Sequence, residues 1–85
     1  MHAFISDAHP NPATCNFSVK YILNSSLKAE IIISDIFGKI VKRVILSEKE
    51  EVVTISIESF IEGIYFYTLT VNNLFVSTKK IVVER

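Results

Sequence analysis

The sequence is poor in residues that form crosslinks or carry catalytic chemistry. Its single cysteine, Cys15, has no partner for an intrachain disulfide, so the fold must depend on its hydrophobic core. No cation or helix N-terminus is expected beside Cys15 to activate the thiol, which favours a partly buried, inert side chain. The two histidines, His2 and His9, lie in an N-terminal stretch without periodicity, where nothing rigid would aim a base. We therefore expect no catalytic residue and no enzyme.

The chain also lacks net charge and long hydrophobic runs. Nine Lys and Arg residues balance nine Asp and Glu residues, and no basic run is longer than the pair Lys79-Lys80. Nucleic-acid binding needs a positive surface, so DNA and RNA are excluded as partners. The longest apolar runs are three or four residues, whereas a membrane helix needs about 20. The sequence therefore predicts no membrane insertion.

Residues that bind metals are few and poorly spaced. Asp7 and His9 would supply only two ligands on an irregular leader, and neither a CxxC nor an HExxH motif is present. Glu48, Glu50 and Glu51 form a small acidic patch. It lacks the glycine-punctuated spacing of a calcium loop and is more typical of a solvated turn. We expect no metal and no cofactor.

What the sequence has in abundance is β-branched residues, with 13 Ile and 9 Val against 5 Leu. Such side chains suit a pleated sheet better than a helix. Six segments read as strands, at intervals of about 8–12 residues: Phe17–Leu23, Ala29–Asp35, Lys39–Leu46, Val52–Ile57, Gly63–Val71 and Leu74–Val83. A short seventh is possible at Ala13–Cys15. The sequence predicts an all-β, immunoglobulin-like antiparallel β-sandwich of six to seven strands.

Turn signals divide the chain. The turn Pro10-Asn11-Pro12 separates a leader or linker, residues 1–10, from a domain over residues 11–85. Asn24-Ser25-Ser26 ends the first strand. The third and fourth segments look like neighbours joined by the charged turn Ser47–Glu51. Asn72-Asn73 indicates a two-residue type I′ hairpin, because Asn tolerates positive φ.

The segment from Phe60 to Tyr65 has the layout of a tyrosine corner, in which a Tyr hydroxyl bonds back to upstream backbone. Gly63 would adopt a conformation closed to residues with Cβ, and Tyr65 would bury its ring; both roles are structural. Farther on, Lys79 and Lys80 lie mid-strand, on opposite faces. Either one of them discourages edge-to-edge pairing of sheets, or they take part in recognition.

Five motifs occur in a recognisable order: Asn11-Pro12-Ala13-Thr14, a strand ending Tyr21-Ile22-Leu23, Asp35-Ile36-Phe37-Gly38-Lys39-Ile40-Val41, Gly63-Ile64-Tyr65-Phe66-Tyr67-Thr68-Leu69, and Lys79-Lys80-Ile81-Val82-Val83 at the end. Together, from about Pro10 to Arg85, they resemble the type A C-terminal sorting domain of the type IX secretion system. No single motif is specific; the order is what carries the resemblance. The charged stretch Ser47–Glu51 replaces the glycine-containing loop expected in such domains.

The resemblance implies a targeting module at the end of a larger exported protein of Bacteroidota. The upstream cargo would cross the inner membrane with a Sec signal, which Met1–His9 does not resemble. From the periplasm, an outer-membrane translocon would recognise the folded domain and deliver the cargo to the cell surface or medium. A sortase-like cysteine peptidase would remove the domain, with a cut expected in the leader Met1–His9.

The resemblance also assigns roles to individual residues: Asn11 and Pro12 to the entry turn, Asp35, Gly38 and Lys39 to the mid-domain turn, Gly63 and Tyr65 to the corner, and Lys79, Lys80, Ile81, Val82 and Val83 to the strand that the secretion machinery needs. A terminal hairpin with lysines on both faces suits recognition by strand addition or by an acidic groove.

A second function remains open from the residues alone. The chain would then be a structural or carbohydrate-binding immunoglobulin-like accessory domain. Sugar-binding surfaces usually present exposed aromatic rings, and this chain has no Trp. That function would require Tyr67 or Phe75 on an open face.

Overall fold

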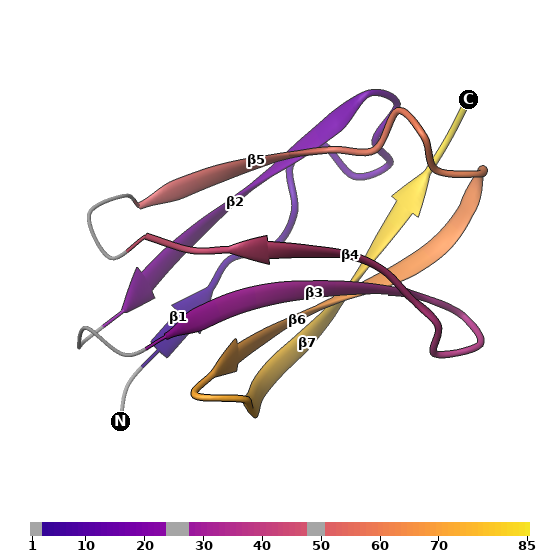
Figure 1. Cartoon of the computed structure of the whole chain (residues 1–85). Coiled ribbons are helices and arrows are strands. Elements are labelled where there is room, and N and C mark those ends of the chain that lie inside the picture. The colour runs from indigo at the N-terminus through magenta and orange to yellow at the C-terminus, as the bar shows by residue number, and fades with distance from the viewer. Residues whose placement is uncertain (1–2, 24–27, 48–50) are drawn as a thin grey trace.

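The computed structural model describes residues 3–23, 28–47 and 51–85, which form seven strands and no helix. The strands are β1 (Ala3–Ile5), β2 (Asn16–Leu23), β3 (Ala29–Asp35), β4 (Ile40–Ile45), β5 (Val52–Ser56), β6 (Gly63–Val71) and β7 (Leu74–Val83). They form two antiparallel sheets, ordered β1-β2-β5 and β4-β3-β6-β7 (Figure 1). The prediction of an all-β sandwich is confirmed.

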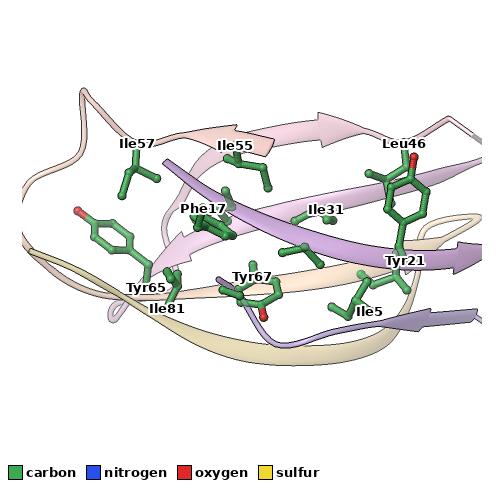
Figure 2. Close-up of a cluster of buried hydrophobic side chains, with 14 of the residues drawn as sticks. Ile5, Phe17, Tyr21, Ile31, Leu46, Ile55, Ile57, Tyr65, Tyr67 and Ile81 are labelled. Atoms are coloured by element: carbon green, nitrogen blue, oxygen red, sulfur yellow. The ribbon is translucent and has the colours of Figure 1, made fainter. Parts of the chain in front are cut away.

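Alternating side chains build the core between the sheets. In β3, Ala29, Ile31 and Ile33 point inward and are buried, while the residues between them are only partly buried. β2 and β6 follow the same period, since apolar residues at alternate positions of a strand share one face. Across the core, the Phe17 and Tyr67 rings lie 5.5 Å apart between centroids (Figure 2). The predicted faces of β2 and β3 are confirmed.

The hairpin between β6 and β7 also forms as predicted. Asn72 and Asn73 have φ values of 53° and 66°, the positive values that a type I′ turn requires at both central residues. The turn pairs Val71 with Leu74 and starts the longest ladder of the domain. This ladder sets the position of the terminal strand, β7.

The expectation of an irregular leader is wrong for residues 3–5, which form the strand β1. β1 pairs with β2 through Ala3–Leu23, Phe4–Ile22 and Ile5–Tyr21, and His9 exchanges backbone hydrogen bonds with Ser18. Ile5 is only 1% exposed. Three residues are too few to display a period, so the sequence pattern missed this strand. The proposed division at residue 10 stays a prediction, although residues on both sides of it share one core.

β1, not Ala13–Cys15, is the seventh strand. Ala13 forms only an isolated parallel bridge with Val83. The side chain of Cys15 is exposed rather than partly buried, because residues 14–15 form a bend between the buried Ala13 and Phe17 and do not continue a strand with a period of two. The prediction that the Cys15 thiol is partly buried is therefore wrong.

β4 and β5 do not pair, contrary to expectation. They belong to different sheets, so the chain crosses the sandwich between them. Alternation reports which face of a strand is buried but not which sheet the strand joins. The two edge strands are linked by the Lys42 ammonium, which donates to the Ser56 carbonyl at 2.8 Å. Glu48 and Glu50, which belong to the proposed turn and acidic patch, lie outside the described residues. The predicted break at residues 24–26 also lies outside them.

Candidate functional site

The terminal strand β7 presents two different faces. Ile81 and Val83 point into the core and are buried. Lys79 lies on the same face, at the margin of the core, opposite Tyr67 on β6. Lys80 and Val82 lie on the outer face of the four-stranded sheet. The two lysines therefore occupy opposite faces, as the period of the strand predicted.

The backbone edge of β7 is already paired near the chain end. The Asn11 side chain donates to the Lys80 carbonyl at 3.2 Å and accepts the Val82 N–H at 3.0 Å, as a neighbouring strand would. Next along the edge, the Ala13 N–H donates to the Val82 carbonyl, and the Ala13 carbonyl accepts from the Glu84 N–H, both at 2.8 Å. The hydrogen-bonding groups of this part of β7 are therefore occupied within the domain, and recognition by strand addition stays a prediction.

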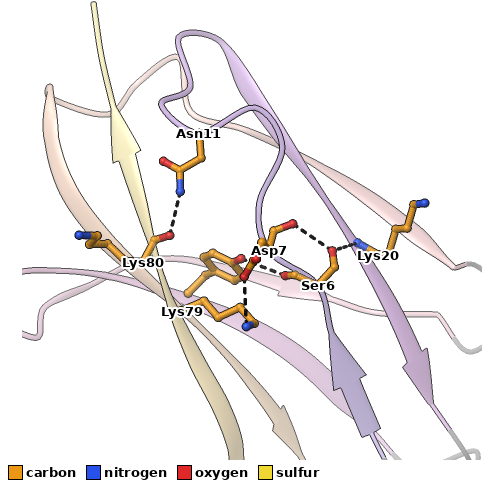
Figure 3. A network of polar contacts seen from close by, with 7 residues as sticks. Ser6, Asp7, Asn11, Lys20, Lys79 and Lys80 are labelled. Carbon is orange, nitrogen blue, oxygen red and sulfur yellow. Dashed lines mark hydrogen bonds and ion pairs between the residues drawn. The ribbon is translucent and has the colours of Figure 1, made fainter.

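The Lys79 ammonium is also engaged (Figure 3). It lies 3.2 Å from Asp7 Oδ1, and the two side chains are 35% and 91% exposed. Such an exposed pair adds little stability, but it places Lys79 against the segment that follows β1. Nearby, the buried Tyr67 hydroxyl donates to the Ser6 carbonyl at 3.0 Å. Burial raises the pKa of Tyr67 to about 12, and the Asp7 charge acts in the same direction.

Lys80, in contrast, lies on an apolar surface. Its partner across the ladder is Phe66, and the next outer-face pair is Ile64 with Val82. Phe66 and Val82 are half-buried, and Ile64 is exposed. Lys80 itself is exposed, so it places a positive charge beside three hydrophobic side chains.

The mid-domain turn is organised by Asp35. One carboxylate oxygen, Oδ1, accepts the N–H groups of Phe37 at 2.9 Å and Lys39 at 3.0 Å. The backbone closes the turn with a 3.0 Å bond from Gly38 N–H to the Asp35 carbonyl. Gly38 has a φ of 85°, which a residue with Cβ adopts at a cost. Asp35 and Gly38 are thus turn-forming residues, and Lys39 contributes its backbone.

The tyrosine corner forms as predicted. The Tyr65 hydroxyl donates to the Ile61 carbonyl at 2.6 Å, four residues upstream. Its ring packs on Phe60, with 5.0 Å between centroids. Gly63 has a φ of 154°, a value that L side chains rarely adopt. Both residues therefore hold the connection between the sheets.

The fold brings the motifs together. Asp35, Tyr65 and Ile81 are register partners across β3, β6 and β7, and Gly63 pairs with Val83. Asn11 reaches the same end of β7, next to the exposed Pro12. The mid-domain turn and the corner line an open cavity of about 270 Å³. The sequence motifs are therefore neighbours on adjacent strands rather than separate sites.

Sequence reasoning missed Arg85, which makes more hydrogen bonds to backbone than any residue predicted for the site. Its guanidinium contacts the carbonyls of Thr14, Ile57, Glu58 and Phe60. A lone terminal arginine resembles any solvated surface charge, so nothing in the sequence indicated these contacts. Among residues 3–23, 28–47 and 51–85, no three His, Cys, Asp or Glu side chains form a group suited to a metal, and no helix is long and apolar enough to cross a membrane.

The fold and the site define a small antiparallel sandwich whose C-terminal strand is tied to its N-terminal segment. Residues 7–84 match the family described as the secretion system C-terminal sorting domain, and the chain belongs to this family. The predicted resemblance is thereby confirmed. The family carries a sorting signal for type IX secretion rather than a catalytic activity, which implies a secreted protein. No curated protein and no solved structure matches the chain.

Proposed function

We propose that this domain is the C-terminal targeting signal of a larger cargo protein of the Bacteroidota. It directs the cargo from the periplasm through the type IX outer-membrane translocon to the cell surface or medium. Family membership supports this function. The observation that carries it at the residue level is the terminal strand β7, which presents the exposed Lys80 beside apolar side chains on the outer face of its sheet.

Within the terminal motif, Lys80 is the positively charged residue that a partner recognises. Lys79 is ion-paired with Asp7, and the backbone edge from Lys80 to Glu84 is paired with Asn11 and Ala13. The outer face around Lys80 combines one charge with apolar neighbours. A complementary groove on the translocon would supply a carboxylate and apolar side chains, since opposite potentials across an interface give specificity.

A sortase-like cysteine peptidase removes the domain after export. Residues 3–9 are paired with β2, and an extended, accessible backbone is what a peptidase needs. The cut therefore falls before Ala3, or β1 must first detach. This modifies the expectation of a cut anywhere in Met1–His9.

The test is export of a Sec-targeted reporter fused to the whole chain, in a bacterium with type IX machinery. Lys80→Glu should reduce the reporter at the surface and in the medium by roughly tenfold and leave it in the periplasm. The reason is that the carboxylate of the groove would repel the new negative charge. Lys20→Glu is the matched control, since Lys20 lies on the outer face of the other sheet. Both variants should keep the melting temperature of the parent.

Two outcomes would count against these proposals. Retention of the unmodified fusion in the periplasm would refute the targeting function, and equal export of both variants would refute the role of Lys80. Mass spectrometry of the released domain reports the cut in the same experiment, and a new N-terminus within residues 6–9 would contradict cleavage before an intact β1.

The accessory-domain alternative has weaker support. Tyr67 is buried in the core, so only Phe75 meets the requirement for an exposed ring. Of the described aromatic side chains, the exposed ones are Phe4 on β1, Phe37 in the mid-domain turn and Phe75 on β7. They lie in three parts of the fold and build no common platform for a sugar.

A further inference from the structure

The Arg85 side chain contacts two segments that are distant in sequence, at one end of the sandwich. The Arg85 guanidinium donates to the Thr14 carbonyl, which precedes β2, and to three carbonyls of the β5–β6 loop: Ile57, Glu58 at 3.2 Å and Phe60 at 2.6 Å. Its backbone N–H donates to Glu62 Oε1 at 2.9 Å. The chain end thus lies beside this loop (Figure 1).

The loop has anchors that do not involve Arg85. Phe60 N–H donates to the Ile57 carbonyl at 3.0 Å, which closes a turn inside the loop. Ile57 N–H donates to the Cys15 carbonyl at 3.0 Å, and Tyr65 holds the Ile61 carbonyl. These bonds fix both ends of the segment whose carbonyls face Arg85. The ring of acceptors is therefore organised before the guanidinium enters it.

The arrangement suits a guanidinium better than an ammonium. A guanidinium is planar and offers five N–H donors in a fixed fork, whereas an ammonium is a compact group with three donors. The Thr14 carbonyl accepts from Nη1, and the three loop carbonyls lie around Nη2, so the two segments are bound by both terminal nitrogens of one planar group. Charge-assisted bonds of this kind are stronger than neutral ones. The Glu62 carboxylate adds a negative charge next to the site.

We propose that the β5–β6 loop and Thr14 form a guanidinium-binding site, filled in cis by Arg85, that fastens the C-terminal end of β7. Glu84, the residue before Arg85, and Val82 form backbone hydrogen bonds with Ala13. When Arg85 occupies the site, β7 is held in the position in which the secretion machinery would bind it. This last consequence rests on the proposed function, whereas the site itself does not.

The test uses the full 85-residue chain and measures thermal unfolding. Arg85→Ala should lower the melting temperature by at least about 4 °C, because several charge-assisted bonds are lost. Guanidinium chloride at about 50 mM, far below its molar denaturing range, should raise the melting temperature of this variant above that in equal NaCl. It should not do so for the unmodified chain, whose site is filled.

Arg43→Ala is the matched control, because the exposed Arg43 side chain lies 4.0 Å from Glu30, a weak and solvated ion pair. It should change the melting temperature by less than about 2 °C and show no gain from guanidinium. Arg85→Lys tests the chemistry of the group and should recover only part of the loss. Full recovery by lysine, or no gain of Arg85→Ala from guanidinium, would overturn the proposal.

A measurement on the unmodified chain covers the case in which Arg85→Ala does not fold. In NMR spectra, the guanidinium N–H protons of Arg85 should exchange with solvent at least about tenfold more slowly than those of Arg43, because they are hydrogen-bonded. Equal exchange rates would overturn the site. None of these readouts involves secretion, so their failure is distinct from failure of the targeting function.

Discussion

Several residues of the sorting-domain motif act by substituting for backbone partners. The Asn11 amide bonds to the edge of β7 as another strand would, and the Asp35 carboxylate collects two N–H groups of its turn. The Tyr65 hydroxyl holds a loop carbonyl. Each of these side chains shapes the domain without being presented to a partner. At the residue scale, Lys80 differs from these three because its exposed side chain lies on the outer face of the four-stranded sheet.

Tyr67 should make the domain sensitive to alkaline pH. Its hydroxyl ionises near pH 10 in the unfolded chain but at about pH 12 in the folded one, so ionisation favours unfolding. The stabilising contribution is complete below pH 10 and is lost between pH 10 and 12, by about 2–3 kcal/mol. Tyr67→Phe should lose about 1 kcal/mol at pH 8, from the Ser6 hydrogen bond, but lack this alkaline loss.

Urea unfolding of both proteins at pH 8 and pH 11.5 measures this difference, and titration of the remaining groups cancels in the comparison. Parallel loss of stability in the two proteins would contradict the assignment to Tyr67.

At the scale of elements, the short strand β1 and the segment after it act as a strap along one side of the sandwich. Residues 3–9 follow β2, and Asn11 and Ala13 then cover the edge of β7. This protects an edge that could otherwise pair with another chain. The strap also brings Asp7 to Lys79. The leader is therefore an integral part of the fold.

Two substitutions in β1, one on its buried face and one on its exposed face, test whether this strand packs against the core. Ile5→Ala should cost about 2–4 kcal/mol, because Ile5 is 1% exposed and its removal leaves a cavity. Phe4→Ala is the control on the opposite face, where the ring is 55% exposed, and should cost less than about 1 kcal/mol. Chemical unfolding measures both. Equal costs would mean that β1 does not pack as described.

At the scale of the whole molecule, the core needs both ends of the chain. Ile5 near the start and Val83 near the end belong to one cluster of buried residues, and Arg85 contacts Thr14. Such contacts, distant in sequence, are typical of β-sandwiches. The core therefore depends on residues of both β1 and β7.

Deleting residues 79–85 should therefore unfold the domain rather than merely remove a recognition signal. The deletion takes Ile81 and Val83 from the core, each worth about 2 kcal/mol, together with the strand pairing and Arg85. A domain of this size has a total stability of only about 4–13 kcal/mol. Far-UV circular dichroism and proteolysis should report an unfolded chain.

The matched control for the deletion changes only outward residues. The double variant Lys80→Thr and Val82→Thr keeps the buried residues and the β propensity of the strand. It should remain folded with a similar melting temperature. A folded deletion variant would show that the terminal strand is dispensable for the core, and loss of export on deletion could then be assigned to recognition.

The sequence by itself determined the fold class, the faces of β2 and β3, the β6–β7 hairpin and the corner at Tyr65. Each depends on local rules: alternation with a period of two, positive φ at Asn72 and Asn73, and a hydroxyl within reach of nearby backbone. Local patterns of this kind are present in a single strand or turn, so they can be read without the rest of the molecule.

Only the tertiary structure decided which sheet each strand joins and what surrounds the terminal strand. β1 was too short to show a period, and β4 and β5 carry no mark of the sheet to which they belong. The roles of Asn11, Lys79 and Arg85 depend on partners about 70 residues away along the chain. Such pairings arise from the packing of the two sheets, which no local pattern encodes.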